Sequence, residues 1–439
     1  MATALRGTGV AMRGREAPNE TDGGLLRTLT ELLETSHRAA VEDLPAMVGA
    51  SARRAGLGDV QIYLIDLQQN VLRRLRGRHF GGGAPLETAD AIRALGSDAE
   101  QDEIRVDTTL AGRAFQEVRT LAKTGPGDRP EHWWVPLVDG SERIGVLRVA
   151  PAGDDEGAIE AMQHLASLLS LLLVSKGSFS DTYARIVRSR PMNVAAELQW
   201  NLMPPLTFSD SVVTIAGMLE PAYEIGGDAF DYSIAGTVAH LAIFDAMGHD
   251  VSAGLTANLA VAACRNNRRQ GIGLTDNSEQ IEQVLIEEFG KANRFVTAIL
   301  ADLDTTTGTF TWVNRGHHPP VVIRRGRWIA TLQCPPAHPM GLGLGLPVTL
   351  CREQLEPGDR VLLYTDGITE LRTPGGTEFG LPRFVDFVIR QEASGLPVPE
   401  TLRRLTRAVL DYHDHRLDDD ATVLFVEWHG PPQRLDDEA

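Results

Sequence analysis

Aspartates stand at the ends of several apolar segments in the C-terminal half of the sequence. Asp245 ends the segment VAHLAIFD, and Asp366 ends the segment RVLLYTD. Asp228 follows two glycines in EIGGDAFDY, and the aspartates at 418–420 directly precede ATVLFVEW. Strand ends in a common sheet can converge, and converging carboxylates repel one another strongly unless cations hold them. These acidic positions together therefore indicate a cation site.

The chemistry of such a site follows from its ligands. Ligand sets made only of oxygen favour hard divalent ions, Mg²⁺ or Mn²⁺. Two such ions ~3.5–4 Å apart, sharing one carboxylate, form an apparatus for in-line hydrolysis of a phosphate ester. An isolated carboxylate at a strand end is usually a solvated turn residue, so the hypothesis depends on the whole set. A glycine beside the acid lets the backbone come close, and a neighbouring main-chain carbonyl can complete the coordination.

Length and charge exclude other classes of protein. The chain has 439 residues, which predicts at least two domains. Its 42 Lys and Arg against 59 Asp and Glu give a net charge of −17, which argues against binding to nucleic acid. With 43% hydrophobic residues, the chain can build real cores.

Cysteine usage and hydropathy indicate the compartment. Cys264, Cys334 and Cys351 are far apart and form no C-x-x-C pair, so we expect neither a disulfide framework nor a thiolate zinc site. The longest aliphatic run, residues 165–174, is about half of the ~20 residues that a bilayer requires. No apolar stretch follows the arginines of the first 23 residues. We expect a cytoplasmic protein without a membrane partner.

The elements of the N-terminal part predict one α+β domain at 24–175, after a disordered arm at 1–23. A helix is expected at 25–48, and hairpins in VQIYLIDLQQNVLRRL and in HWWVPLVDGSERIGVLRVA, the latter with an Asp139-Gly140 turn. A second helix carries an apolar stripe from Met162 to Leu173. Helix, antiparallel strands and helix form a compact unit.

The C-terminal part predicts a β-sandwich flanked by helices at 206–429, followed by a loose tail at 430–439. A linker at 176–205 contains a short amphipathic helix that stops at Pro204-Pro205. Beyond it, six apolar segments are typical of strands, and helices are expected at 251–265, 278–289 and 400–413. Strands and helices are grouped rather than alternating, which disfavours a doubly wound parallel sheet.

Five segments in order resemble the motifs of the SpoIIE-like branch of the metal-dependent PPM protein phosphatases. They are EIGGDAFDY, IFDAMGHD, WVNRGHHPPVVIR, LEPGDRVLLYTDGITEL and DDDATVLFV, and the resemblance covers about residues 193–428. Residues 25–175 resemble a GAF domain in the patterns IYLIDL, TLAGRAF and VPLVDGSERIGVLRV. The resemblance implies an α+β protein in which a GAF-like sensory domain precedes an α-β-β-α phosphatase sandwich.

Carried over residue by residue, the phosphatase resemblance implies a two-metal site. Asp228 would bind the first metal, and Asp245 would bridge the two. Asp366 and Asp419 would hold the second metal, with Asp419 placed by counting back from Thr422. The same resemblance assigns one further backbone ligand and three neighbours of the ligands: the carbonyl of Ala246 as the ligand, and Asp231, Gly367 and Asp420 as the neighbours.

The implied activity is attack on phosphoserine or phosphothreonine by water that two Mn²⁺ or Mg²⁺ ions activate, without a phosphoenzyme. By analogy with the family, the substrate is a phosphorylated regulatory protein, a STAS-type antagonist of an anti-sigma factor. The GAF-like domain, with a possible small-molecule effector, would regulate the enzyme through the 176–205 helical switch in a homodimer. Two alternatives stay open: a signal-binding scaffold that docks a partner, and a phosphohydrolase for small phosphoesters.

Two residues depart from the family pattern. Asp250 stands where a small residue is usual, and it could cap the helix that starts at Val251 or add charge near the metals. Arg315 also replaces a small residue, and we expect an effect on the surface only. His249, His317 and His318 are expected to be structural or to lie behind the ligands, because the ligand set contains only oxygen.

Overall fold

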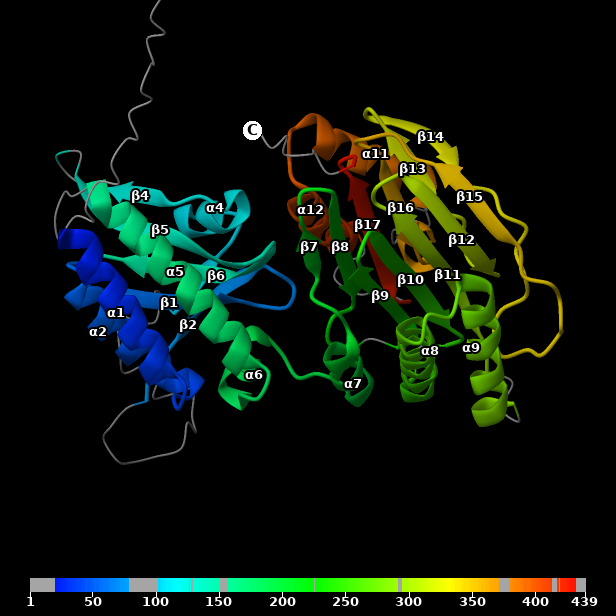
Figure 1. The fold of residues 1–439 in the computed structure, drawn as a ribbon, viewed down its shortest axis with the longest axis horizontal. Coiled ribbons are helices and arrows are strands. Elements are labelled where there is room, and N and C mark those ends of the chain that lie inside the picture. Colours follow the sequence, from blue (N-terminus) through cyan, green and yellow to red (C-terminus); the bar gives the residue numbers. More distant parts are fainter. Residues whose placement is uncertain are drawn as a thin grey trace, which may run out of the picture. The chain divides into compact units, whose positions relative to one another are not determined.

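The computed structural model describes residues 20–431, except for 79–101, 126, 128, 151–155, 225, 249, 291–293, 371–378, 413–416 and 418. The predicted arm at 1–23 and tail at 430–439 therefore lie mostly outside the described residues. The chain divides into two compact units, one built mainly from residues up to Ile186 and the other mainly from Val187 onward. Figure 1 labels their elements.

The first unit is built on a six-stranded sheet with the strand order β3-β2-β1-β6-β5-β4. Its central strands β1 and β6 pair antiparallel, as do β4 and β5 at one edge. Both predicted hairpins are confirmed. The strands are β1 (Val60–Ile65), β2 (Val71–Leu75), β3 (Glu103–Arg105), β4 (Leu121–Thr124), β5 (Pro130–Asp139) and β6 (Glu142–Val149).

The single helix predicted at 25–48 is wrong, because the structure has two helices there. Helix α1 (Glu20–Ser36) ends before a short 3₁₀ turn at Val41–Asp43, and α2 (Leu44–Arg54) follows. Pro45 explains the interruption: proline fits the first turn of a helix but removes a hydrogen bond from its interior. The remaining helices of this region are α4 (Leu110–Glu117), α5 (Glu156–Gly177) and α6 (Asp181–Val187).

Helix α5 carries the predicted apolar stripe, and its side chains form part of the core. Met162, Leu165, Leu169 and Leu173 are all at most 2% exposed. Among the described helices, α5 alone is long and apolar enough to cross a membrane, with a mean hydropathy of 1.5 and 44% of that stretch buried. A core helix of a globular unit meets the same criterion, and the burial of this stripe is what such a helix requires.

The second unit is a sandwich of two sheets, in the orders β15-β12-β11-β10-β9 and β14-β13-β16-β17-β8-β7. The first sheet contains β9 (Asp228–Ala235), β10 (Val238–Ala246), β11 (Val296–Asp304), β12 (Thr309–Arg315) and β15 (Leu350–Gln354). The second contains β7 (Thr207–Ser209), β8 (Val213–Glu220), β13 (Val321–Arg324), β14 (Arg327–Thr331), β16 (Arg360–Tyr364) and β17 (Ala421–Trp428).

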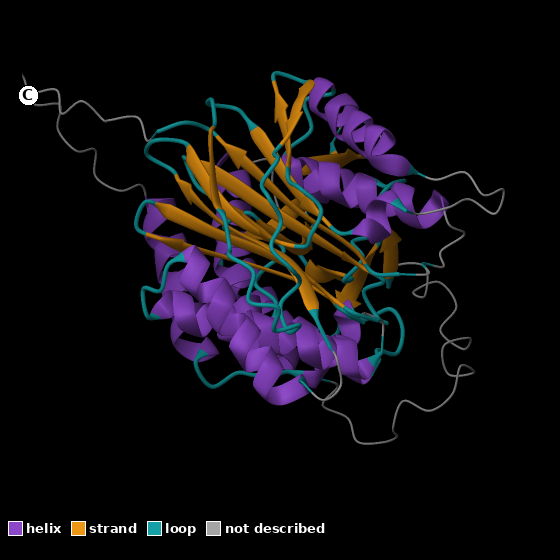
Figure 2. Cartoon of the chain, turned by 90° about the vertical axis from the view of Figure 1, so that its right-hand side faces the viewer, coloured by secondary structure: helices purple, strands orange, loops and turns teal. Residues whose placement is uncertain are grey.

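Helices cover the outer face of each sheet, as Figure 2 shows. Phe230, Ile243 and Leu424 belong to the apolar layer between the sheets. Helices α8 (Val251–Arg269) and α9 (Leu274–Phe289) pack on the outer face of the first sheet. Helices α11 (Gly380–Ala393) and α12 (Val398–Tyr412) cover the second sheet. The predicted α-β-β-α arrangement is confirmed, although α11 was not predicted. Helix α7 (Val194–Leu202), the predicted linker helix, ends before Pro204-Pro205.

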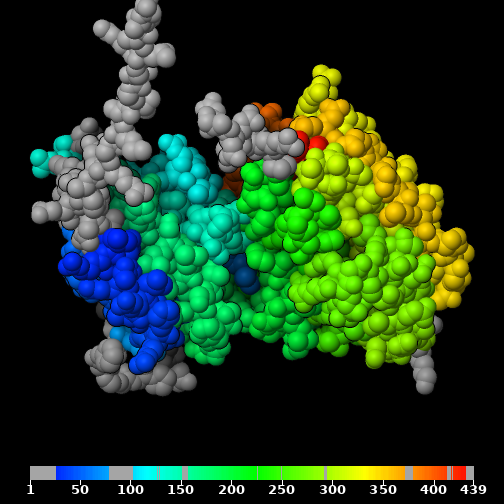
Figure 3. Space-filling model, viewed as in Figure 1, coloured from blue at the N-terminus to red at the C-terminus, as the bar shows by residue number. Residues whose placement is uncertain are grey.

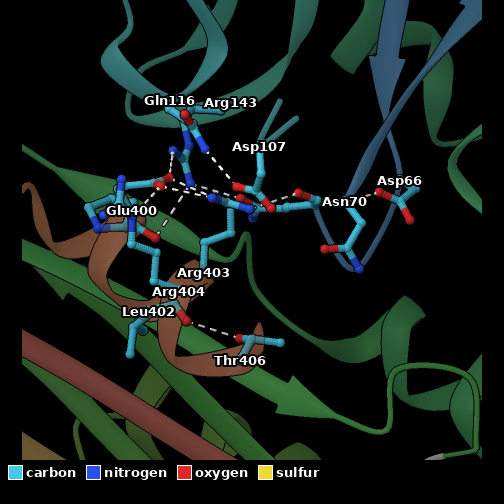
Figure 4. A network of polar contacts seen from close by, with 12 residues as sticks. Asp66, Asn70, Asp107, Gln116, Arg143, Glu400, Leu402, Arg403, Arg404 and Thr406 are labelled. Carbon is cyan, nitrogen blue, oxygen red and sulfur yellow. Dashed lines mark hydrogen bonds and ion pairs between the residues drawn. The ribbon is translucent and has the colours of Figure 1, made fainter. Parts of the chain in front are cut away.

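Helix α12 separates an apolar face from a charged one. Leu402, Leu405 and Val409 are buried in the core beneath it. On the charged face, the Glu400 carboxylate accepts hydrogen bonds from Arg403 Nε at 2.9 Å and Arg404 Nε at 3.0 Å (Figure 4). Partners three and four residues apart meet on one side of a helix, so this network stabilises α12 in the orientation that buries its leucines.

The expectation about the cysteines is wrong for one pair. The structure joins Cys334 and Cys351 in a disulfide, with their Cα atoms 5.9 Å apart. Cys351 lies on the edge strand β15, and the fold brings Cys334, 17 residues earlier, next to it. The spacing in the sequence does not reveal this proximity. Cys264 is buried and unpaired, and burial raises the pKa of its thiol to about 12.

Arg315 is fully buried, so the expectation that it affects only the surface is wrong. Its guanidinium pairs with the Glu282 carboxylate on α9 and donates from Nε to the His338 carbonyl at 3.0 Å. Glu282 also accepts from the backbone N–H of Gly343 at 3.0 Å. These bonds attach the segment 338–343 to α9. Residues 342–346 are exposed, and this part of the chain lies yellow-orange at the right of Figure 3.

We predict that Arg315→Met destabilises the second unit far more than Arg325→Met, whose side chain is 84% exposed. Removing one partner of a buried ion pair costs about 3–5 kcal/mol, because the other charge stays buried and uncompensated. An exposed pair contributes about 0–1 kcal/mol. Differential scanning calorimetry of the full chain measures both, and equal unfolding temperatures for the two variants would contradict the assignment.

Candidate metal centre

Asp228 and Asp245 lie side by side at one end of the first sheet. Strands β9 and β10 are antiparallel, and their register places Asp245 directly opposite Asp228. Both residues share a strand face with a residue of the layer between the sheets, Phe230 in β9 and Ile243 in β10. Asp228 is 3% exposed, and Asp245 is half-buried. The two carboxylates therefore sit where the gap between the sheets opens.

The second sheet contributes the other acids at the same place. Asp366 directly follows β16 and begins the short helix α10 (Asp366–Thr369). Thr365, the residue before it, donates its hydroxyl to Asp228 Oδ2 at 2.6 Å. That hydroxyl also accepts the N–H of Thr422, at the start of β17, at 3.0 Å. One threonine thus connects the ends of three strands from both sheets.

Asp420 holds the loop that carries Asp228. Its carboxylate accepts the backbone N–H groups of Gly226 at 2.8 Å, Gly227 at 2.6 Å and Asp228 at 3.1 Å. Successive N–H groups that point inward form a site for a negative charge. Burial raises the pKa of Asp420 to about 6, while these N–H groups act in the opposite direction. Asp419, by contrast, is exposed. Asp420 thus positions Asp228, and the ligand role of Asp419 stays a prediction.

Two glycines permit the close approach of backbones at this point. A Cβ on Gly227 would lie 2.3 Å from the carbonyl oxygen of Ala246, the predicted backbone ligand. A Cβ on Gly367 would lie 1.8 Å from the carbonyl oxygen of Asp420. Neither distance is possible for a side chain, so the strand ends can meet only because both residues are glycine.

The acidic side chains of the cluster raise one another's pKa values. Burial first, and then the charges of Asp366, Asp419 and Asp420, raise the pKa of Asp245 to about 7. The pKa of Asp228 is also raised, first by burial and then by Asp245 and Asp420. Such a cluster favours the binding of a cation. Without one, repulsion between the carboxylates keeps protons bound to them, and a cation can take the place of these protons.

The donor types fit hard divalent cations, since the acids offer only oxygen. Nevertheless, among the described residues no three acidic, histidine or cysteine side chains form a ready group of metal ligands. The structure therefore brings Asp228, Asp245 and Asp420 together, with Asp366 and Asp419 near enough to raise the pKa of Asp245, but it does not close a coordination sphere.

His317 is structural, as expected. Its Nε2 donates to the Tyr364 carbonyl at 3.0 Å, so its Nδ1 carries no proton and accepts from the Thr297 hydroxyl at 2.7 Å. Burial and the neighbouring His318 lower the pKa of His317 to about 3, so the ring stays neutral. Thr297 lies opposite Asp245 in the register of β10 and β11, with its hydroxyl 3.5 Å from Asp245 Oδ2.

The sequence reasoning missed Thr297 and Thr365. Neither belongs to the acidic pattern from which the site was inferred. The one available signal was position: Thr365 directly precedes Asp366, and Thr297 lies near the start of an apolar strand. Without the pairing of strands, nothing in the sequence connects either threonine to a particular carboxylate.

Asp231 does not join this cluster, contrary to the expectation that it assists the ligands. It lies three positions after Asp228 on β9 and therefore points to the opposite face of the strand. There it is fully buried, and its carboxylate pairs with Arg265 and Arg268 of α8, each at 2.7 Å. Asp231 thus stabilises the packing of α8 on the sheet.

Asp250 caps α8, which confirms the first of its two readings. Its side chain accepts the N–H of Ala253 at 2.8 Å, and this bond, with the Arg294 guanidinium 3.3 Å away, keeps the pKa of Asp250 below its usual range. The cap fixes the start of the helix immediately after the Ala246 strand end. His249 and Asp418 lie outside the described residues.

We predict that the neighbours Asp419 and Asp420 differ in their effect on stability. Asp420→Asn should lower the unfolding temperature of the metal-free protein, since hydrogen bonds to a charged group contribute about 1.5–3 kcal/mol and the amide presents an N–H group to three donors. Asp419→Asn should leave the unfolding temperature unchanged or raise it, because it removes a negative charge that repels the Asp245 carboxylate. Calorimetry in chelator tests both, and equal shifts would contradict the positioning role of Asp420.

Comparison with known proteins bears on this geometry. The model of the family described as stage II sporulation protein E (SpoIIE) matches residues 235–429. Phosphoserine phosphatase RsbU of Bacillus subtilis is 24% identical over 240 residues, which cover 54% of this chain and 69% of RsbU. Protein IcfG of Synechocystis is 27% identical over 99 residues, 23% of this chain and 16% of IcfG.

Solved structures give weaker likenesses. The RsbU and RsbW domains of Rv1364c from Mycobacterium tuberculosis match with a TM-score of 0.43 and 25% identity, over 52% of this chain and 64% of that one. The SiaA-PP2C domain of Pseudomonas aeruginosa matches with a TM-score of 0.43 and 21% identity, over 48% of this chain and 85% of that one.

The match to the SpoIIE family model spans β10 to β17 and includes Asp245, Asp366 and Asp419. It leaves the type of the first unit unassigned. Residues 235–429 are therefore similar to the SpoIIE family of phosphatases, and about half of the chain is similar to phosphoserine phosphatase RsbU.

Proposed function

We propose that this chain is a metal-dependent phosphatase that hydrolyses phosphoserine or phosphothreonine on a regulatory protein. The observation that carries the proposal is the meeting of Asp228, Asp245 and Asp420 where the two sheets end. A buried group of carboxylates is unfavourable by itself, and the need for a cation explains why the fold retains it.

Asp228, Asp245, Asp366, Asp419 and the carbonyl of Ala246 would hold two Mg²⁺ or Mn²⁺ ions. Bound ions would supply positive charge against the phosphoryl oxygens and lower the pKa of water. The chain's other residues keep the acids in place: Asp420 fixes the loop before β9, the Thr365 hydroxyl orients one oxygen of Asp228, and neutral His317 holds Thr297 beside Asp245.

A protein substrate is supported by the surroundings of the acids. Met247, directly after Ala246, is 40% exposed, and Val251 and Leu255 on the first turns of α8 are 48% and 47% exposed. An apolar margin of this kind suits a polypeptide better than a small phosphoester. The name of the relative RsbU, a phosphoserine phosphatase, agrees with a phosphoprotein substrate. We take a STAS-type antagonist of an anti-sigma factor as the candidate.

Regulation by the first unit is part of the proposal. The segment 176–205 contains α6 and α7, and on α7 Val194 is 66% exposed and Leu198 is 44% exposed. Exposed apolar side chains on a helix between two units favour pairing with a second copy, so we propose a cytoplasmic homodimer in which this segment transmits the state of a GAF-like sensor. A chain starting near Asn193 that stayed monomeric and equally active would exclude this role.

We predict that Asp245→Ala removes metal-dependent activity on p-nitrophenyl phosphate and on a phosphoserine peptide. The loss should be at least about 100-fold, since even residues that only support metal ligands cost 10–100-fold. Asp304→Ala is the matched control, because Asp304 ends the neighbouring strand β11 at the opposite end of the sheet. Assays with Mn²⁺, with Mg²⁺ and with chelator measure the effect, and equal activity of both variants would refute the proposal.

We predict that the metal-free protein loses stability as the pH rises from 5 to 8. The pKa of Asp245 is about 7 in the folded state against an ordinary value of 3.8, so the folded chain binds more protons in this range. The contribution is complete below the unfolded pKa and is lost as pH rises through the folded pKa. Calorimetry in chelator should show a steeper decline for wild type than for Asp245→Asn.

Added Mn²⁺ should reverse the loss of stability at pH 8, because the ion takes the place of the protons. Metal binding near pH 7 should therefore release protons, which titration calorimetry in two buffers of different ionisation enthalpy detects. An unchanged proton count, or identical pH profiles for wild type and Asp245→Asn, would contradict the coupling between the carboxylates.

A further inference from the structure

A cavity of about 610 Å³ lies in the first unit, lined by one face of the sheet together with the start of α4. Strands β1, β4, β5 and β6 contribute Tyr63, Lys123, His132, Trp134 and Arg148 to its wall. None of these residues takes part in the proposed phosphatase chemistry. Gln61 lies opposite Arg148 in the register of β1 and β6. Tyr63, two residues after Gln61 on β1, therefore lies on the same face of the sheet as Arg148.

Aromatic rings form the apolar part of this wall. Tyr63 is 1% exposed, His132 is 4% and Trp134 is 7%. The rings of Tyr63 and Trp134 meet edge to face with centroids 5.6 Å apart, and those of His132 and Trp134 do so at 5.3 Å. Rings fixed by such contacts offer a rigid surface, and another planar ring gains contact with it at little cost in conformational entropy.

The wall of the cavity carries more cations than acids: Arg105, Lys123 and Arg148 against Glu103 and Glu131. The acids Glu131 and Glu103 are already paired, with Lys123 at 3.0 Å and with Arg73 at 2.9 Å. Arg148 is half-buried and has only neutral partners in the described part of the chain, Gln61 Oε1 at 3.3 Å and His132 Nδ1 at 3.5 Å. A guanidinium without an acidic partner in a concave apolar site is suited to bind a carboxylate.

His132 adds a directed donor. Its Nδ1 faces the Arg148 guanidinium, which can only donate, so Nδ1 accepts and the proton resides on Nε2. Burial, together with the charges of Arg148 and Lys123, lowers the pKa of His132 to about 4, so the ring stays neutral at physiological pH. Nε2–H has no partner among the described residues, although His132 is only 4% exposed.

We propose that this cavity binds a small aromatic carboxylate, with the ring against Trp134 and Tyr63 and the carboxylate at Arg148. The volume admits a bicyclic ring system, since ligand pockets range from ~300 to ~1,000 Å³. This ligand would be the effector of the first unit, so the proposal rests on the sensor role that we propose above for that unit. Binding itself does not require phosphatase activity, so the two proposals can fail separately.

The test is titration calorimetry of the full chain with benzoate, salicylate, indole-3-carboxylate and 2-naphthoate, each beside its neutral carboxamide. We expect at least one carboxylate to bind with a Kd below about 1 mM and its carboxamide to bind at least about tenfold more weakly. Absence of binding by all four carboxylates would overturn the proposal. Equal binding of acid and amide, or binding of AMP but of no carboxylate, would overturn it too.

Variants locate the site. Arg148→Gln should weaken the bound carboxylate about tenfold and leave its carboxamide unchanged, whereas Arg148→Lys should retain part of the preference. Arg113→Gln is the matched control, since Arg113 is an exposed arginine of α4 paired with Glu117. Asp245→Ala should bind the carboxylate as wild type does. Undiminished carboxylate binding by Arg148→Gln would refute the role of Arg148.

Discussion

Repulsion between buried carboxylates is the constraint on which the second unit depends. Asp228 and Asp245 face each other across two strands, and Asp420 adds a third acid between them and the second sheet. Each group loses hydration and gains a like-charged neighbour, so burial and charge both raise the pKa values. In the described part of this chain, neutral partners hold these three acids in position.

Those partners come from the backbone and from uncharged side chains. N–H groups of residues 226–228 hold Asp420, and hydroxyl groups stand beside the other two acids. Cationic partners occur elsewhere: Arg315 and the pair of arginines on Asp231 lie outside this cluster. A lysine or arginine inside the cluster would satisfy the acids permanently and would remove their demand for a divalent ion.

The sequence predicted the layers and most of the acids, because both depend on local patterns. Apolar segments marked the strands, and the ends of these segments placed Asp245 and Asp366 at strand ends. What it could not predict depends on contacts between distant segments. Arg315 looked like a surface residue until β12 and α9 came together, and Asp231 looked like a helper of Asp228 because three residues separate them in sequence. A strand turns that spacing into opposite faces.

The order of the strands gives the Asp420 bond network a consequence for folding. Strand β17 is the last strand of the second unit in the chain, yet it lies between β16 and β8 in the middle of its sheet. The loop before β9 receives its carboxylate anchor from the residue that precedes this final strand. During synthesis, the first acidic position is therefore made roughly two hundred residues before the residue that fixes it, as their separation of 192 shows. A partly synthesised chain therefore contains Asp228, Asp245 and Asp366 but still lacks the carboxylate that fixes the loop before β9.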